Sequence, residues 1–161
     1  MTTMMTATLR NRLLALGALW GVLLAAAPAL VMTRPYRLTG FLVAALVCAA
    51  LSGCVGTLAA GGWALRKGRS GGVLAGLGTG LLQGLVGGAV GAALIWALMA
   101  LTLSGFTLED PVELSTLMSP RIFLGSFFVA LSVFLYTLAG GLLLGPAFGT
   151  LVNRAVREGG P

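Results

Sequence analysis

The sequence predicts an all-α integral membrane protein. The expected fold is a bundle of four transmembrane helices in two hairpins, with a short outer-surface helix in the loop between the third and fourth spans. Of the 161 residues, 58% are hydrophobic and only 9% are charged, and the mean hydropathy is +1.02. A soluble domain carries about 25% charged residues, so this chain cannot cover a surface that faces water. The composition excludes a soluble globular protein and a disordered one, and the length fits a single domain over residues 1–161.

Four long stretches without Asp, Glu, Lys or Arg predict the transmembrane helices. A helix needs about 20 mostly apolar residues to cross a bilayer. The uncharged stretches cover residues 13–32, 38–65, 71–103 and 122–152. The last three exceed the required length, so we expect tilting, kinking or helical extension beyond the hydrocarbon. Kinks are expected at Pro28 and at the pair Gly145 and Pro146, because proline removes a backbone N–H and crowds the preceding turn.

The basic residues predict the orientation of the spans. With four spans, the N-terminus, the loop between the second and third spans, and the C-terminus share one side of the membrane. That side carries seven basic residues, and the other side carries three. The seven are Arg10, Arg12, Arg66, Lys67, Arg69, Arg154 and Arg157. By the positive-inside rule, both termini are then cytoplasmic.

The overall charge and the residue usage suggest a location. The net charge of +6 is attributed to topology and to attraction to anionic lipid, and no nucleic-acid binding is expected. Arginine dominates over a single lysine, and Ala, Leu and Gly are abundant, as in proteins of GC-rich bacterial genomes. The expected location is therefore a bacterial inner (cytoplasmic) membrane.

The first span also resembles a secretory signal peptide. Arg10 and Arg12 precede an apolar run that contains three consecutive alanines at residues 25–27, a pattern typical of a cleavage site. Against cleavage, the apolar run continues through Met32, and Pro28 would directly follow the cut. We expect the segment to remain as a span. A mature chain that begins near residue 28 or 30 would contradict the four-span prediction.

Residues 106–120 form the longest expected loop and hold three of the four acidic residues. Asp110, Pro111 and Glu113 match a helix start, with an N-cap, a proline at the first helical position and an acid three residues after the cap. We expect a short helix on the outer membrane surface here. The favoured interpretation is a capped connector whose acids face water. The alternative is a vestibule that attracts cations or a docking site for a partner.

Glycine at every fourth position is the most informative pattern in the sequence. The predicted helix-packing residues are Gly72, Gly76, Gly80, Gly84 and Gly88 in the third span and Gly141, Gly145 and Gly149 in the fourth. Helices in lipid associate through close packing, which glycine permits because it has no side chain. Each four-residue step turns about 40° beyond a full turn, so the stripe drifts around the helix and can meet two neighbours. We therefore expect the third span at the centre of the bundle. Packing within one chain is favoured over self-association into a homo-oligomer.

Polar chemistry within the spans is limited to a few neutral side chains. Gln83 is the most telling of them, since an amide in hydrocarbon requires a hydrogen-bond partner. Interhelical bonding is its favoured role, and lining of a pore or ligand cavity is the alternative. Cys48 and Cys54 lie six residues apart on one predicted helix, beyond disulfide reach, and are expected to be packing residues. The chain has no histidine and no charged residue in its predicted spans, so we expect no catalytic residue, no cofactor and no metal site.

The pattern as a whole favours a non-enzymatic multi-pass membrane protein that acts as a packing, assembly or accessory subunit. Packing chemistry is extensive in this sequence, whereas reactive chemistry is scarce. The alternative is an oligomeric channel or permease for a small neutral solute. The expected partners are the lipid bilayer and either further copies of the chain or other membrane subunits.

Overall fold

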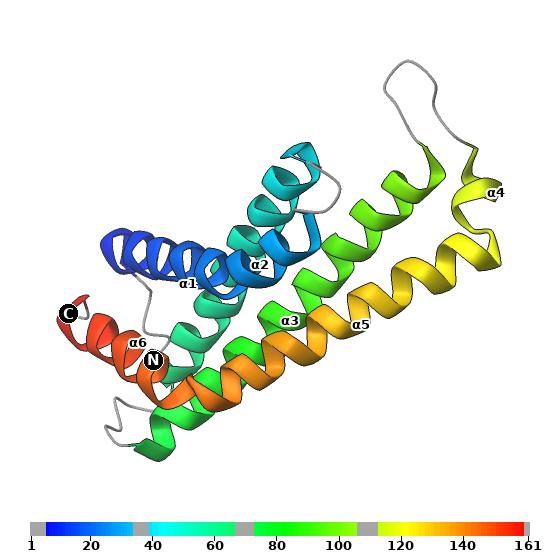
Figure 1. Cartoon of the computed structure of the whole chain (residues 1–161). Helices are drawn as coiled ribbons and strands as arrows, with labels where there is room; N and C mark the ends of the chain where they lie inside the picture. The colour runs from blue at the N-terminus through cyan, green and yellow to red at the C-terminus, as the bar shows by residue number, and fades with distance from the viewer. Residues whose placement is uncertain (1–5, 34–38, 67–72, 106–112, 160–161) are drawn as a thin grey trace.

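The computed structural model describes residues 6–33, 39–66, 73–105 and 113–159, and their regular structure is entirely α-helical. The helices are α1 (Ala7–Thr33), α2 (Thr39–Arg66), α3 (Val73–Ser104), the single turn α4 (Leu114–Leu117), α5 (Pro120–Leu143) and α6 (Gly145–Gly159) (Figure 1). The predicted all-α class is confirmed for this part of the chain.

Four helices are long and apolar enough to span a membrane, as the sequence predicts. The candidate spans are Ala7–Ala26, Gly40–Arg66, Leu74–Ser104 and Pro120–Leu143. Their surfaces carry large apolar side chains, since Leu23, Val43 and Phe128 are each about 60% exposed, at 61%, 59% and 63%. Exposed apolar surface on this scale is typical of helices whose solvent is lipid.

The fourth span ends earlier than the predicted stretch of residues 122–152. Helix α5 stops at Leu143, and a separate helix, α6, leaves from Gly145 in another direction (Figure 1). Pro146 is the physical reason, because it has no N–H to donate to the carbonyl four residues earlier and its ring crowds that carbonyl. At Pro28, by contrast, α1 stays helical as far as Thr33. The expected kink at residues 145 and 146 is therefore a break between two helices.

Helix α3 lies between its neighbours and contacts α2, α5 and α6, while α1 packs along α2 (Figure 1). Helix α6 lies over the end of the bundle where α1 begins (Figure 1). A buried apolar cluster joins α6 to the start of α1 there, with Leu9 and Leu13 against Phe148 and Val152. The Trp20 ring stacks on Phe148 with ring centroids 4.5 Å apart. The fold thus has a dry cluster at one end and a long α3–α5 pair that extends to the other.

The predicted helix in the loop is represented by the single turn α4. Asp110 and Pro111, which would cap it, lie outside the described residues. Glu113 accepts hydrogen bonds at its backbone oxygen from the N–H groups of Thr116, at 3.0 Å, and Leu117, at 3.4 Å. Its carboxylate accepts a bond from the Ser115 hydroxyl at 3.1 Å. The described part of this loop is therefore a local turn that leads into α5.

Candidate functional site

The glycine stripe of α3 faces α5 and α6 of the same chain. A Cβ atom built on Gly80 would lie 2.9 Å from the Gly141 carbonyl oxygen and closer still to the Gly145 Cα. Real Cβ atoms essentially never come within 3.0 Å of another heavy atom. The backbone of α3 therefore lies so close to the backbones of α5 and α6 at Gly80 that a side chain on Gly80 would force the helices apart.

Most of the predicted packing residues are brought together in pairs along this contact. A Cβ on Gly76 would lie 3.0 Å from the Pro146 carbonyl oxygen, and one on Gly149 would meet the Gly76 backbone. Gly84 faces the Gly141 Cα, at 3.3 Å from its Cβ position. The remaining two sites are Gly88, which faces the Phe134 ring, and Gly72, which lies outside the described residues.

A second stripe on α3 faces α2 and was missed from the sequence. A Cβ on Gly87 would lie 3.1 Å from the Ser52 carbonyl oxygen, and one on Gly56 would lie 2.8 Å from the Gln83 backbone oxygen. Gly91 continues the same face, with its Cβ position 3.3 Å from the Ser52 side chain. Gln83, Gly87 and Gly91 share a four-residue spacing. That spacing is the signal that could have placed the glutamine on a helix-contact face.

A cavity of about 510 Å³ lies among α1, α2, α3 and α5, beside this second stripe. Four glycines that contact a neighbouring helix, Gly21, Gly53, Gly87 and Gly91, are among its lining residues. Larger apolar side chains such as Phe128 form other parts of the wall. None of the described residues that line the cavity is charged.

Gln83 is the only amide side chain in the described wall of the cavity, and its carbonyl oxygen has no partner there. The residue is 1% exposed, and its Oε1 atom accepts no hydrogen bond from any residue that the structure describes. A buried polar atom without a partner costs about 1–3 kcal/mol. The sequence favours interhelical hydrogen bonding for Gln83. Among the described residues, Oε1 makes no such bond. Gln83 is also among the residues that line the cavity.

The hydroxyl groups around the cavity are already engaged with backbone oxygens. Ser52 donates to the Ala49 carbonyl at 2.9 Å, and Ser132 donates to the carbonyl four residues before it at 2.9 Å. Tyr136 differs, because its hydroxyl reaches from α5 to α1 and donates to the Leu24 carbonyl at 3.0 Å. Each of these hydroxyl groups already donates its proton to a backbone carbonyl, although its oxygen can still accept a hydrogen bond. None of them satisfies Gln83.

Among the described residues, the cysteines and acidic side chains do not come together in one group. Cys48 and Cys54 are free thiols, and the Cys54 thiol donates to the Leu14 carbonyl across α1 and α2 at 3.3 Å. Within the described ranges, no group of three His, Cys, Asp or Glu side chains could hold a metal ion. Of the three loop acids, Glu113 is exposed, while Glu109 and Asp110 lie outside the described residues. The predicted vestibule stays a prediction.

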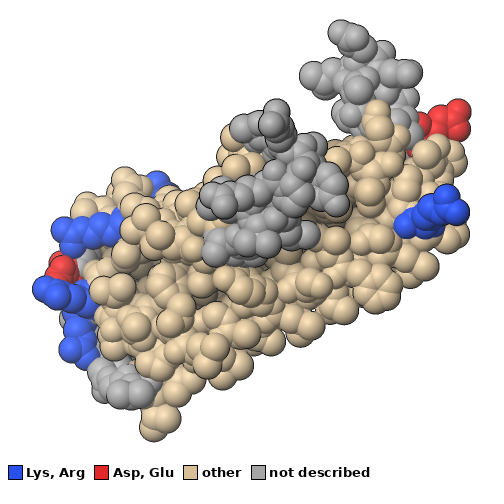
Figure 2. Space-filling view, viewed as in Figure 1, with Lys and Arg blue, Asp and Glu red and all other residues tan. Residues whose placement is uncertain are grey.

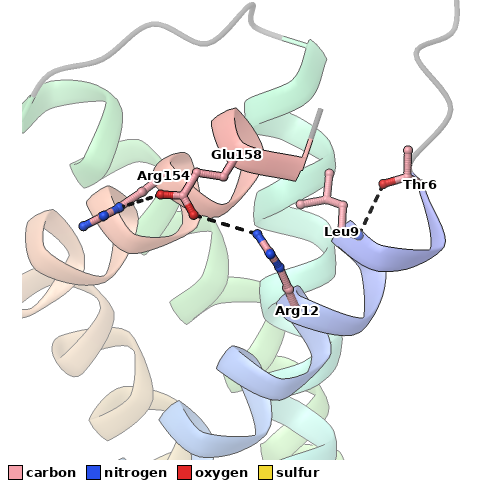
Figure 3. Close-up of polar contacts among 5 residues, drawn as sticks. All are labelled: Thr6, Leu9, Arg12, Arg154 and Glu158. Atoms are coloured by element: carbon pink, nitrogen blue, oxygen red, sulfur yellow. Dashed lines mark hydrogen bonds and ion pairs between the residues drawn. The ribbon is translucent and has the colours of Figure 1, made fainter. Parts of the chain in front are cut away.

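The described charged side chains gather at the two ends of the molecule, and most of the described basic ones lie at the end formed by α1 and α6 (Figure 2). Glu158 of α6 contacts two arginines at this end. It accepts a hydrogen bond from Nε of Arg154 at 2.8 Å, and its Oε2 atom lies 3.8 Å from Nη1 of Arg12 on α1 (Figure 3). The hydrogen bond from Arg154, and then the attraction of its charge, holds the pKa of Glu158 below its usual value. Nearby, the Leu9 N–H donates to the Thr6 hydroxyl at 3.3 Å and caps α1.

No family model matches the chain, and neither a curated protein nor a solved structure matches it. The described residues nevertheless define a class. This is a helical protein with four helices able to span a membrane, closely packed at glycines, and with an uncharged cavity beside a buried glutamine.

Proposed function

We propose that this chain is a non-enzymatic multi-pass membrane protein that acts as an accessory subunit and holds an uncharged membrane molecule in its cavity. A cavity of about 510 Å³, whose described lining is mostly apolar, uncharged and includes the amide residue Gln83, carries the proposal. Ligand sites are typically mostly apolar cavities of 300–1,000 Å³ with a few convergent polar groups. The cavity fits that description in size and in lining.

The lining also supports binding in preference to chemistry. Acid–base catalysis needs a group that exchanges a proton near neutral pH, and nucleophilic catalysis needs a base beside the nucleophile. The serine, threonine and tyrosine hydroxyls of the described wall have no such base among the other described lining residues. They donate to backbone oxygens, as the Ser52 and Tyr136 bonds illustrate.

We also propose how the helices pair and how they are oriented in the membrane. The helices form two hairpins, α1 with α2 and α3 with α5, joined by glycine zippers, and both termini lie in the cytoplasm of a bacterial cell. The support is the packing of α1 along α2 and α3 along α5, together with the basic end formed by α1 and α6. Cysteines placed at Thr6 and Met118, in a chain without Cys48 and Cys54, would test the orientation. A membrane-impermeant maleimide on spheroplasts should label position 118 and spare position 6.

The alternative of an oligomeric channel or permease draws less support from this geometry. Its oligomeric part would need a surface that joins separate copies of the chain, and the glycine stripes are one candidate for that surface. The stripe at Gly80 and Gly84 is covered by α5 and α6 of its own chain instead.

A cavity-filling variant tests the proposed function without knowledge of the ligand. Val133 lines the cavity, so Val133→Trp should fill it. Leu135 lies on the same helix and is 54% exposed, so Leu135→Trp is a matched control that leaves the cavity open. Mass spectrometry of molecules that copurify in mild detergent should find a small molecule with the natural chain and with the control, and none with Val133→Trp. Identical copurifying molecules in all three proteins would refute the proposal.

A further inference from the structure

We infer that the uncharged molecule in the cavity is a lipid, and that the cavity holds one straight hydrocarbon chain of that lipid. This inference rests on the proposed binding function and names its ligand class. Three features of the cavity carry it, namely the chemistry of the wall, the part of α2 that the wall covers, and the volume. The head group of the lipid then lies outside the cavity, at the start of α2.

The described wall offers an occupant few polar partners. The hydroxyl protons of Ser52, Ser132 and Thr137 are donated to carbonyl oxygens of their own helices, and that of Tyr136 is donated to a carbonyl of α1. Gln83 is only 1% exposed, so its amide presents almost no surface to an occupant. None of the described lining residues is charged. Because a polar or charged group costs free energy when it is buried without a partner, this wall matches a hydrocarbon.

The lining residues of α2 extend from its first turn to its middle. They begin at Phe41, close to the start of the helix at Thr39, and end at Gly53, halfway to Arg66. At 1.5 Å for each residue, this stretch covers about 18 Å. One leaflet supplies about 15 Å of hydrocarbon, which is half of the bilayer core. The wall therefore follows α2 over the depth of a single leaflet, as a lipid chain does.

Helices α3 and α5 line the cavity beside this part of α2. The lining residues of α3 fall within 83–95, and those of α5 fall within 128–137. The Gly87 Cβ position is 3.1 Å from a backbone oxygen of α2, and the Gly88 Cβ position is 3.2 Å from the Phe134 ring of α5. The three stretches therefore run side by side, and the lining residues are spread along the helices in the direction of a bilayer chain.

The volume matches one chain of this length. An extended polypeptide advances about 1.2 Å for each backbone atom, and at that rate a stretch of about 18 Å holds about 15 carbons. At about 30 Å³ for each group the size of a water molecule, 510 Å³ holds about 17 groups. Two such chains would need about 900 Å³. One turn of an α-helix fills roughly 420 Å³, so a spanning helix of a partner protein does not fit.

The cavity borders the apolar surface of the spans. Phe128 and Tyr136 line it and are also 63% and 47% exposed. Both belong to α5, whose exposed side chains include several large apolar ones such as Leu124 and Leu131. A chain of the surrounding bilayer can therefore enter from the side, without passing through water.

The test locates the two ends of a bound chain. The full-length protein is placed in nanodiscs of diphytanoyl phosphatidylcholine, whose chains are branched. Two photoreactive forms of hexadecanoylglycerol, an uncharged lipid, carry a diazirine either near the carbonyl group or near the terminal methyl group of the chain. The carbonyl-end probe should label α2 near Phe41. The methyl-end probe should label α2 near Gly53 or α3 near Gln83.

Chain length gives a second measurement. Unlabelled octanoylglycerol and hexadecanoylglycerol compete with the methyl-end probe, each at a known mole fraction in the membrane, so that partitioning into the bilayer does not contribute. The octanoyl chain leaves about half of the cavity unfilled, so it should need about a tenfold higher mole fraction for the same competition. Competition by dihexadecanoylglycerol would assign the chain to a two-chain lipid, and its absence would assign it to a single-chain lipid. Both results keep a chain in the cavity.

Two variants control for lipid that merely surrounds the protein. Val133→Trp fills the cavity and should abolish labelling by the methyl-end probe at Gly53 and Gln83, whereas Leu135→Trp, on the exposed surface of α5, should leave it unchanged. If Val133→Trp failed to fold, the positions of the label and the chain-length comparison in the natural chain would still decide the question.

Equal competition by the octanoyl and hexadecanoyl chains, or labelling confined to outward-facing positions such as Leu135, would overturn the inference. That result leaves two distinguishable cases. If Val133→Trp still removes a copurifying molecule, the proposed binding function stands and only the ligand class is wrong. If Val133→Trp removes nothing, the proposed function falls as well. A copurifying peptide or protein segment that Val133→Trp releases would assign the cavity to a macromolecular partner and contradict the lipid chain.

Discussion

Substitution of Gly80 by alanine should destabilise the bundle, although alanine is the better helix former. In α3, a Cβ on Gly80 would lie 2.9 Å from both the Gly141 carbonyl oxygen and the Gly145 carbonyl carbon, and closer to the Gly145 Cα. All three of these atoms belong to the backbone, so no side-chain rotation relieves the overlap. The helices must separate to admit a single methyl group.

The magnitude follows from a comparison with a glycine in open space. Gly62 of α2 has no heavy atom within 4 Å of its Cβ position. Alanine gains about 1 kcal/mol over glycine in a helix interior at either site, so this gain cancels between the two variants. Overpacking costs about 1–3 kcal/mol, and rigid backbone atoms place Gly80→Ala at the upper end. Gly80→Ala should therefore be about 3 kcal/mol less stable than Gly62→Ala.

Thermal unfolding in dodecyl maltoside, followed by the fluorescence of the three tryptophans, measures this difference. For a chain of this size, about 1 kcal/mol shifts the melting temperature by roughly 2–4 °C. Gly80→Ala should melt roughly 6–12 °C below Gly62→Ala, and Gly62→Ala should match or exceed the natural chain. Equal melting temperatures for the two variants would refute the close backbone contact of α3 with α5 and α6.

Three further variants test separate contacts. Phe148→Ala should release α6, at a cost of about 3–5 kcal/mol for a fully buried aromatic, and protease should then cut the C-terminal segment sooner than in Leu151→Ala, whose side chain is 50% exposed. Tyr136→Phe should lower the melting temperature by about 2–4 °C, since it loses one interhelical hydrogen bond worth about 1 kcal/mol. The ion pair of Glu158 with Arg154 should hold above the ordinary carboxyl pKa of 4.5 and weaken as the pH falls through the lowered pKa of Glu158. Proteolysis of the C-terminal segment should therefore accelerate on acidification, and Glu158→Gln should abolish that pH dependence.

Composition was sufficient to predict the helical class and the number of helices able to span a membrane. Both depend on local properties, namely uncharged length and hydropathy, which need no knowledge of the neighbours. The end of the fourth such helix was harder to predict. Pro146 can kink a helix or end it, and the residues just after it are as apolar as those before it. Only the later polar positions, such as Arg154, mark α6 as a different kind of helix.

The cavity could not be predicted, because it depends on how far apart α1, α2, α3 and α5 lie. The sequence identifies Gln83 as an exceptional polar residue, but its partner depends on the register between α2 and α3. The spacing of Gln83, Gly87 and Gly91 indicates a helix-contact face. It does not reveal that the glycines hold α2 so close, or that Oε1 is left without a donor. The site therefore emerges only from the packed helices.

The most direct test of the membrane-spanning bundle compares two exposed positions that differ in their expected solvent. Leu135 of α5 is 54% exposed, and the Arg154 side chain of α6 is 78% exposed. Each is replaced by cysteine in a chain without Cys48 and Cys54, and open membrane fragments, with both faces accessible, are treated with a water-soluble maleimide. Position 154 should be labelled rapidly, and position 135 should not be labelled until the membrane is dissolved in denaturing detergent. Equally rapid labelling of both positions in intact membranes would show that α5 faces water and would contradict the account.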